Sequence, residues 1–183
     1  DGAWGMAVNH ILLKELHHEK QTPYFLEYQK KYTDGPHLVE IEEGPAGAKA
    51  GRLLRADRLA PYASVENGEW KFLMWDETTN QPKMPMGSAG FRWGRERGKW
   101  NLLLEDGLYG DKIEPALTFL GSSDEVVQVT FEDFGAEKTT KRGVPVRTLE
   151  LADGSTVKVA TVYALLFAQY GVSRGLEGDY PTG

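Results

Sequence analysis

Residues 149–159 read Leu-Glu-Leu-Ala-Asp-Gly-Ser-Thr-Val-Lys-Val, with an Asp-Gly pair between two stretches in which apolar and polar residues alternate. Alternation with a period of two places the apolar side chains of a strand on one face. Asp-Gly between two such stretches is a strong short-range sign of a hairpin. The sequence therefore predicts a β-hairpin with a type I′ turn at Asp153 and Gly154.

Other short segments in the middle of the chain, separated by Gly, Pro and Asn, are typical of strands in a small, mostly antiparallel sheet. Residues 72–75 are apolar throughout, which favours a central strand, whereas alternation over residues 127–131 favours a half-buried one. Residues 78–90 contain two prolines and two glycines and are predicted to form a long loop. The predicted strands cover residues 37–43, 51–55, 69–76, 100–105, 112–120 and 126–131.

Helices are predicted near both ends of the chain. Apolar residues surround most of a helix over residues 4–20, so this helix is expected to need burial on several sides. Thr22 and Pro23 are typical N-cap and N1 residues for a second helix that ends near residue 32. Thr161 is the expected N-cap of a last helix, and Gly171 is its expected C′ residue.

These segments predict an α+β fold, with helices near both ends of the chain around a small, mostly antiparallel sheet. The chain is treated as one domain over residues 1–183. Within it we expect four parts: a helical segment (1–35), a β-rich insert (36–160), a helix (161–172) and a loose tail (173–183).

The composition is that of a globular domain, since 40% of the residues are hydrophobic and 26% are charged. A net charge of −6 argues against a general nucleic-acid binder, and the apolar runs are too short to cross a membrane. The absence of cysteine excludes disulfides and thiolate-bound metal centres. The chain starts at Asp1 without a visible secretory signal, and we expect it to be a fragment of a longer protein.

Residues 90–101, here called the aromatic–basic run, combine three aromatic residues, four cations and three glycines. One interpretation is structural: the aromatic rings pack into a small core, and the cations pair with nearby carboxylates. The other is an anion site, in which Arg92 or Lys99 supplies charge and Trp93 a stacking plane. The glycine spacing does not fit a phosphate-binding Walker loop.

Histidines and carboxylates give no clear active site. The helical spacing of His10, His17 and His18 does not suit one metal ion, and a solvated stripe or a former interface is the better interpretation for them and for His37. The candidate acid–base residues, Glu40, Glu42, Glu43, Glu132 and Asp133, are interpreted as solvated strand edges. We find no set of nucleophile, base and orienting residue, so no catalytic or metal-binding residue is predicted.

Several landmarks in one order nevertheless resemble a known family. The chain resembles the alpha (catalytic) subunit of membrane-bound respiratory nitrate reductase, a bis-molybdopterin guanine dinucleotide enzyme of the dimethyl sulfoxide reductase superfamily. The resemblance extends from Asp1 to about Leu176. Its landmarks are residues 1–7, 24–34, 51–56, 87–94, 98–102, 120–125, 151–156, 161–163 and 170–171.

The resemblance implies a parent enzyme that reduces nitrate to nitrite at molybdenum. It implies electron supply from quinol through a beta subunit with iron–sulfur clusters and a gamma subunit with haem. The parent would be cytoplasmic and peripheral on the inner face of the cell membrane. The family's iron–sulfur and molybdenum ligands lie upstream of the position matching Asp1, so no cofactor is expected in this chain itself.

Three residues are carried over as cofactor contacts of the parent. Asp1 matches the end of a loop that closes on a guanine end of the cofactor, where a carboxylate can accept hydrogen bonds from guanine N1 and N2. Arg92 and Trp93 are the other two. The fragment itself is expected to be a non-catalytic scaffold that flanks the cofactor domain. In isolation it is expected to self-associate or to rearrange its first helix. The alternative is a stand-alone anion- or nucleotide-binding module that uses residues 91–100.

Overall fold

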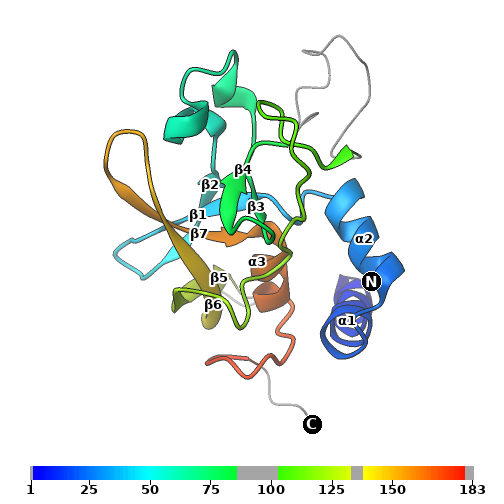
Figure 1. Ribbon diagram of the computed structural model, residues 1–183. Coiled ribbons are helices and arrows are strands. Elements are labelled where there is room, and N and C mark those ends of the chain that lie inside the picture. Colours follow the sequence, from blue (N-terminus) through cyan, green and yellow to red (C-terminus); the bar gives the residue numbers. More distant parts are fainter. Residues whose placement is uncertain (1, 86–102, 133–137, 180–183) are drawn as a thin grey trace.

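The computed structural model describes residues 2–85, 103–132 and 138–179. It confirms the α+β class: a helical segment, a curled antiparallel sheet, a small hairpin and a last helix follow one another along the chain (Figure 1). The helices are α1 (Gly2–Leu12), the π-helix η1 (Leu13–Glu19), α2 (Pro23–Tyr32), three short 3₁₀ turns, η2 (Ala56–Arg58), η3 (Ala60–Tyr62) and η4 (Gly68–Trp70), and α3 (Val162–Gln169). The strands are β1 (Leu38–Glu42), β2 (Lys49–Leu53), β3 (Met74–Asp76), β4 (Gln81–Lys83), β5 (Glu125–Glu132), β6 (Thr139–Glu150) and β7 (Thr156–Thr161).

The larger sheet has the order β2-β1-β7-β6-β5, and every neighbouring pair of its strands is antiparallel. Strand β6 is long enough to pair with two neighbours in turn. Its residues 139–146 pair with β5, and its residues 147–150 pair with β7. Strand β6 therefore passes from one pairing to the other, and the sheet curls at this point (Figure 1).

The predicted hairpin is confirmed as β6–β7, in which Leu149 pairs with Val157, but the predicted turn type is wrong. The Gly154 N–H donates to the Leu151 carbonyl (2.9 Å), and of the two residues predicted to form the turn only Gly154 has a positive φ, of 81°. A type I′ turn needs positive φ at both central residues. Asp153 instead supports the turn with its side chain, which accepts from the Ser155 N–H (2.9 Å).

The sequence placed the remaining strands with mixed success. The segments predicted at 37–43, 51–55 and 126–131 correspond to β1, β2 and β5, and the one at 69–76 keeps only β3. Residues 112–120 do not form a strand, and the described part of 100–105 has only an isolated bridge. Strand β4 and residues 139–148 of β6 were missed, because their residues do not alternate clearly between apolar and polar.

Two apolar layers cover opposite faces of the sheet. One contains Leu38, Leu73, Trp75, Phe119 and Val159, and brings the β3–β4 hairpin and the 3₁₀ turns onto the sheet. The other lies between the sheet and α3 and contains Val39, Ile41, Val127, Val129, Val144, Val146, Ala160 and Leu165. Successive residues of one strand therefore serve different layers, as the period of two requires.

Helix α3 begins and ends as predicted. Thr161 is fully buried, and its Oγ1 accepts from the Ala164 N–H (3.0 Å) and donates to the Leu117 carbonyl (2.6 Å). At the other end Gly171, with φ of 66°, donates to Ala168, and the next residue donates back to Phe167. These two bonds form a Schellman motif.

The first two helical segments and α2 form a unit that we call the helical arm (residues 2–32). The predicted helix over 4–20 is present, but its second half is the π-helix η1. Thr22 has the extended backbone of an N-cap, whereas its side chain makes no capping hydrogen bond. The arm lies to one side of the sheet, beside α3 (Figure 1).

The predicted loose tail is wrong for its described part, residues 173–179. The Arg174 guanidinium binds the Asp179 carboxylate (2.7 Å) and the Gly143 carbonyl (2.8 Å), and both charged side chains are almost fully buried. The Gly143 N–H donates to the Glu177 carbonyl (2.7 Å). This stretch of the tail is thus fastened to β6.

We predict that Thr161→Val lowers the free energy of unfolding by about 1–3 kcal/mol, because it removes both the helix cap and the bond to the Leu117 carbonyl. Thr156→Val, at the exposed start of the same strand, is the matched control and should change stability by less than about 0.5 kcal/mol. Urea unfolding followed by circular dichroism measures both. Equal effects of the two substitutions would contradict the role given to Thr161.

Candidate functional site

The three residues predicted to face the cofactor of a parent enzyme, Asp1, Arg92 and Trp93, lie outside the described residues, as does the whole aromatic–basic run. Their roles stay predictions. The described residues offer three other places to examine: the buried histidines and carboxylates, one pocket, and the exposed side of the helical arm.

Two of the four histidines do not lie on a solvated stripe, which was one of the two interpretations of the sequence. His17 and His37 are buried, with 8% and 3% of their surfaces exposed. The correction for His17 has a structural cause, since the wider turns of the π-helix η1 rotate it away from the direction that α-helical spacing gives. Its ring packs against the rings of Tyr163 (5.0 Å) and Phe167 (5.1 Å) of α3.

Burial changes the protonation of both histidines. Burial, with smaller contributions from the charges of His18 and Lys30, lowers the pKa of His17 from 6.5 to about 4. Burial also lowers the pKa of His37 to about 4. Both rings are therefore neutral at pH 7, and His17 joins the arm to α3 as an aromatic, uncharged group.

Glu40 is also not on a solvated edge as predicted. It is buried in β1, where its carboxylate forms ion pairs with Arg52 of β2 (3.3 Å) and with Arg58 of η2. Glu42, two residues along the strand, is about half exposed and lies 3.7 Å from Lys49. Glu40 therefore links β1, β2 and η2 through its ion pairs.

Two further buried carboxylates hold loops. Asp106 accepts from the Tyr62 hydroxyl (2.6 Å) and from the backbone N–H groups of Met84, Leu108 and Tyr109. Asp76 accepts from the N–H groups of Thr78, Thr79 and Glu114 and from the Thr79 hydroxyl. Across residues 2–85, 103–132 and 138–179, no group of three or more His, Asp or Glu side chains is placed to hold a metal ion.

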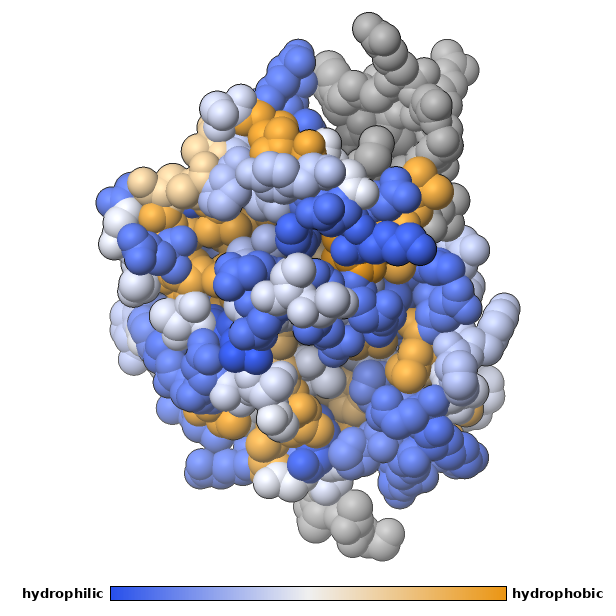
Figure 2. Space-filling model, viewed as in Figure 1, coloured by the Kyte–Doolittle hydropathy of each residue, from blue (hydrophilic) through white to orange (hydrophobic). Residues whose placement is uncertain are grey.

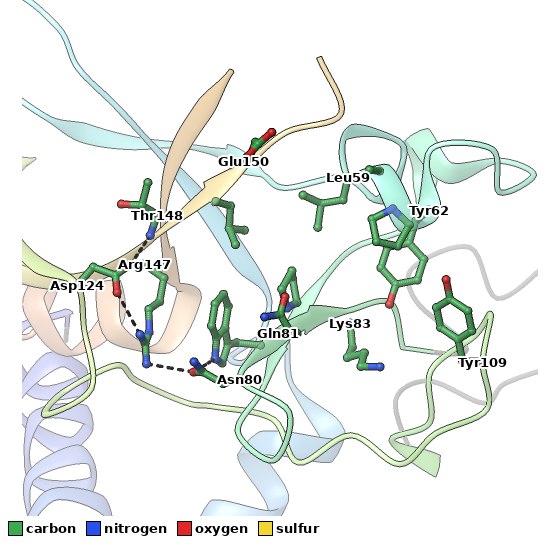
Figure 3. A pocket seen from close by; sticks show the side chains of 15 residues that line it. Leu59, Tyr62, Asn80, Gln81, Lys83, Tyr109, Asp124, Arg147, Thr148 and Glu150 are labelled. Carbon is green, nitrogen blue, oxygen red and sulfur yellow. Dashed lines mark hydrogen bonds and ion pairs between the residues drawn. The ribbon is translucent and has the colours of Figure 1, made fainter. Parts of the chain in front are cut away.

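A pocket of about 590 Å³ lies between the β3–β4 hairpin and the end of β6 (Figure 3). Its apolar lining comes from buried Leu59, Tyr62, Trp75 and Leu149. The polar lining comes from Asn80, Gln81 and Lys83 on one side and from Asp124, Arg147, Thr148 and Glu150 on the other. Sequence reasoning missed this pocket because its parts come from segments up to ninety residues apart with no shared motif.

Arg147 is fixed at one end of the pocket. Its guanidinium binds the Asp124 carboxylate (3.1 Å) and the Asn80 side-chain oxygen (3.2 Å), and it lies over the Trp75 ring at 5.3 Å (Figure 3). At the other end the Lys83 Nζ lies 5.6 Å from the centre of the Tyr109 ring. The pocket thus offers cations, amides and aromatic faces, which suit binding, and its lining holds no nucleophile paired with a base.

The helical arm exposes large apolar and aromatic side chains. Helix α1 has no buried residue. The large hydrophobic side chains that the arm exposes are Trp4, Ile11, Leu12, Tyr24, Tyr28 and Tyr32. Trp4 is 75% exposed and Tyr24 is 79% exposed. On the face shown in Figure 2, which includes part of the arm, hydrophilic residues predominate and apolar residues form small separate groups. The expected all-round apolar helix is therefore present, with its outer side uncovered.

Comparison with known proteins identifies the relatives of the chain. No protein-family model matches it. It is 43% identical to the respiratory nitrate reductase 1 alpha chain of Escherichia coli K12 over 188 aligned residues, which cover 96% of this chain and 15% of that protein. It is 36% identical to the nitrate reductase alpha chain of Bacillus subtilis over 96% of this chain and 14% of that protein. The alpha subunit of Mycobacterium tuberculosis is 36% identical over the whole chain.

Identity of this degree over almost the whole chain defines a homologue of part of a large oxidoreductase subunit. The chain is homologous to one segment of the alpha chains of respiratory nitrate reductases. It spans about 15% of the length of these relatives. Within the described residues, no helix is both long enough and apolar enough to cross a membrane.

We predict that the free energy of unfolding falls as the pH drops from about 6.5 towards about 4. The unfolded chain takes up a proton on His17 near its usual pKa, whereas the folded chain resists until about 4, so protonation favours unfolding in this interval. His17→Phe should reduce this loss, and His37 should account for part of what remains.

Urea unfolding at about pH 7.5 and about pH 5 measures the effect. His18→Phe, on the same turn but partly exposed, is the control and should keep most of the pH dependence of the unsubstituted chain, because burial is the larger cause of the lowered His17 pKa. The assignment to His17 is wrong if both variants lose the same amount of stability on acidification.

Proposed function

We propose that the chain is a non-catalytic scaffold segment of a respiratory nitrate reductase alpha subunit. The whole subunit would reduce nitrate to nitrite at molybdenum held by bis-molybdopterin guanine dinucleotide, and would also hold an iron–sulfur cluster. Electrons would arrive through a beta subunit with iron–sulfur clusters and a membrane gamma subunit with haem. The complex would face the cytoplasm. Homology to the alpha chains of three bacteria supports this assignment.

The observation that carries the scaffold role is the uncovered side of the helical arm. Several large apolar side chains exposed on one structural unit, as Trp4, Ile11 and Tyr24 are on the arm, indicate a contact surface. A chain that matches only 15% of its relatives leaves most of such a polypeptide to supply the covering surface. We propose that the arm docks onto the remainder of the alpha subunit, and that the isolated chain self-associates through the same side.

The buried charges support a structural role. Glu40, Asp76 and Asp106 are all committed to ion pairs or hydrogen bonds that hold strands and loops in place. A catalytic carboxylate would instead have to reach a substrate. We propose that any contact with the cofactor comes from Asp1, with Arg92 and Trp93 as further contacts.

The test uses the full-length alpha subunit that contains this chain. Trp4→Gln together with Ile11→Gln replaces exposed apolar groups of the arm by polar ones. We expect the yield of assembled subunit to fall several-fold, because apolar contact area at the docking surface is lost. Activity per assembled molecule should be retained, since neither residue is given a catalytic role. Gel filtration and nitrate reduction with a dye electron donor measure the two quantities.

Trp70→Gln provides the matched control. Trp70 is also largely exposed, at 58%, but it lies on η4 away from the arm. It should leave the yield unchanged. The proposal fails if the arm variant assembles as well as the Trp70 variant, or if its activity per assembled molecule is lost while assembly is normal.

A further inference from the structure

The end of strand β6 has an open edge beside the pocket. Residues 147–150 pair with β7 on one side. On the other side the pairing with β5 stops at Val146, opposite Glu125. Every backbone N–H and C=O of a strand needs a partner or water. The outward groups of this edge therefore bind either water or another segment of backbone.

The hydrogen bonds around the edge fix which residues point outward. Leu151 donates its N–H to the Ser155 carbonyl (2.7 Å), so it faces β7. Backbone groups of an antiparallel strand alternate in direction from one residue to the next. The odd-numbered residues 147 and 149 therefore also face β7, and the even-numbered residues face away from it.

Outward groups on both sides of Glu150 have partners. The Val146 carbonyl accepts from the Asp124 N–H (3.0 Å), and the Thr148 N–H donates to the Asp124 carboxylate (2.7 Å). Beyond Glu150, the Ala152 N–H donates to the Arg58 carbonyl (2.8 Å). Asp124 and Arg58 thus mark the two ends of a short gap in the ladder.

Glu150 lies in that gap. Neither its N–H nor its carbonyl forms a hydrogen bond with any residue that the structure describes outside β7. The same is true of the Thr148 carbonyl. Glu150, Thr148 and Leu59 all line the pocket, so the gap opens into a space of about 590 Å³ (Figure 3). The edge therefore has room beside it for another stretch of backbone.

The opposite wall of the pocket cannot supply that backbone. It is formed by β4, whose middle residue Pro82 has no N–H and therefore blocks regular pairing along its outer edge. That wall offers side chains instead: the Gln81 amide and the Lys83 ammonium. The Lys83 side chain is 14% exposed, and its Nζ lies 3.7 Å from the exposed carboxylate of Asp111.

We propose that an extended segment from the remainder of the alpha subunit fills this pocket and adds a short strand to β6. One of its residues exchanges both backbone hydrogen bonds with Glu150, and the next but one donates to the Thr148 carbonyl. Its apolar side chains rest on Trp75 and Leu149, and an acidic side chain pairs with Lys83.

This inference rests on the proposed function, because it takes the occupant from the longer polypeptide. The small share of the relatives' length that the chain covers leaves a long remainder from which a segment can come. The site differs from the docking surface on the helical arm, because none of the residues that line the pocket belongs to the arm. The two proposals can therefore fail independently.

Hydrogen exchange of the Glu150 N–H in the full-length subunit tests the pairing, read by mass spectrometry with residue-resolved fragmentation. We expect exchange about 100-fold or more slower than that of an open amide, comparable with the Leu149 N–H that faces β7. Exchange at the rate of an open amide would overturn the inference. If Trp4 and the arm are protected while Glu150 is not, the proposed function stands and this inference alone falls.

A photo-crosslinker tests the occupant. Gln81→p-benzoylphenylalanine in the full-length subunit should crosslink to a segment of the same polypeptide outside residues 1–183. Adding Glu150→Pro, which removes the outward N–H together with the Glu150 side chain, should lower the crosslink yield about tenfold, whereas Glu150→Ala, which removes the side chain alone, should not. A crosslink to another subunit, a crosslink within residues 1–183, or equal yields in the two variants would overturn the proposal.

Discussion

The packing of the helical arm against α3 determines which side of the arm is buried and which side is left exposed. Leu13 and His17 of η1 meet Tyr163 and Phe167 of α3 in one small apolar cluster. This contact requires a neutral His17, which burial ensures by lowering its pKa. Because the contact uses only one side of the arm, the opposite side of α1 is left exposed, and Trp4 with it. We therefore expect another part of a longer polypeptide to cover the outer side of the arm.

A second consequence comes from the length of β6. By changing its partner from β5 to β7, this strand leaves the outward backbone groups of Glu150 without a partner among the described residues. The β3–β4 hairpin faces the same edge without closing it, since Pro82 removes the donor that a regular pairing would need. The arm and the pocket are thus two separate surfaces on which the chain lacks neighbours. Both fit a piece that folds within a longer polypeptide.

The elements with local signals were predictable from sequence. Asp153 and Gly154 located the hairpin, and Thr161 and Gly171 bounded α3, because turn and cap chemistry depends on a few adjacent residues. Burial decided by distant partners was not predictable. His17 was misjudged because a π-helix changes its direction, and the pocket was missed because it is assembled from segments far apart in the chain. The family was recognised from ordered landmarks spread over the chain, and the homology to alpha chains confirms that recognition.

The central claim is that the exposed side of the helical arm is an internal surface of a larger subunit. Hydroxyl-radical footprinting of the full-length alpha subunit, with tryptophan oxidation read by mass spectrometry, tests it directly, because Trp4 and Trp70 are both largely exposed in the chain on its own. The account predicts that Trp4 is at least about tenfold less oxidised than Trp70 in the full-length subunit, since burial excludes the radical together with water. Equal oxidation of Trp4 and Trp70 there would contradict it.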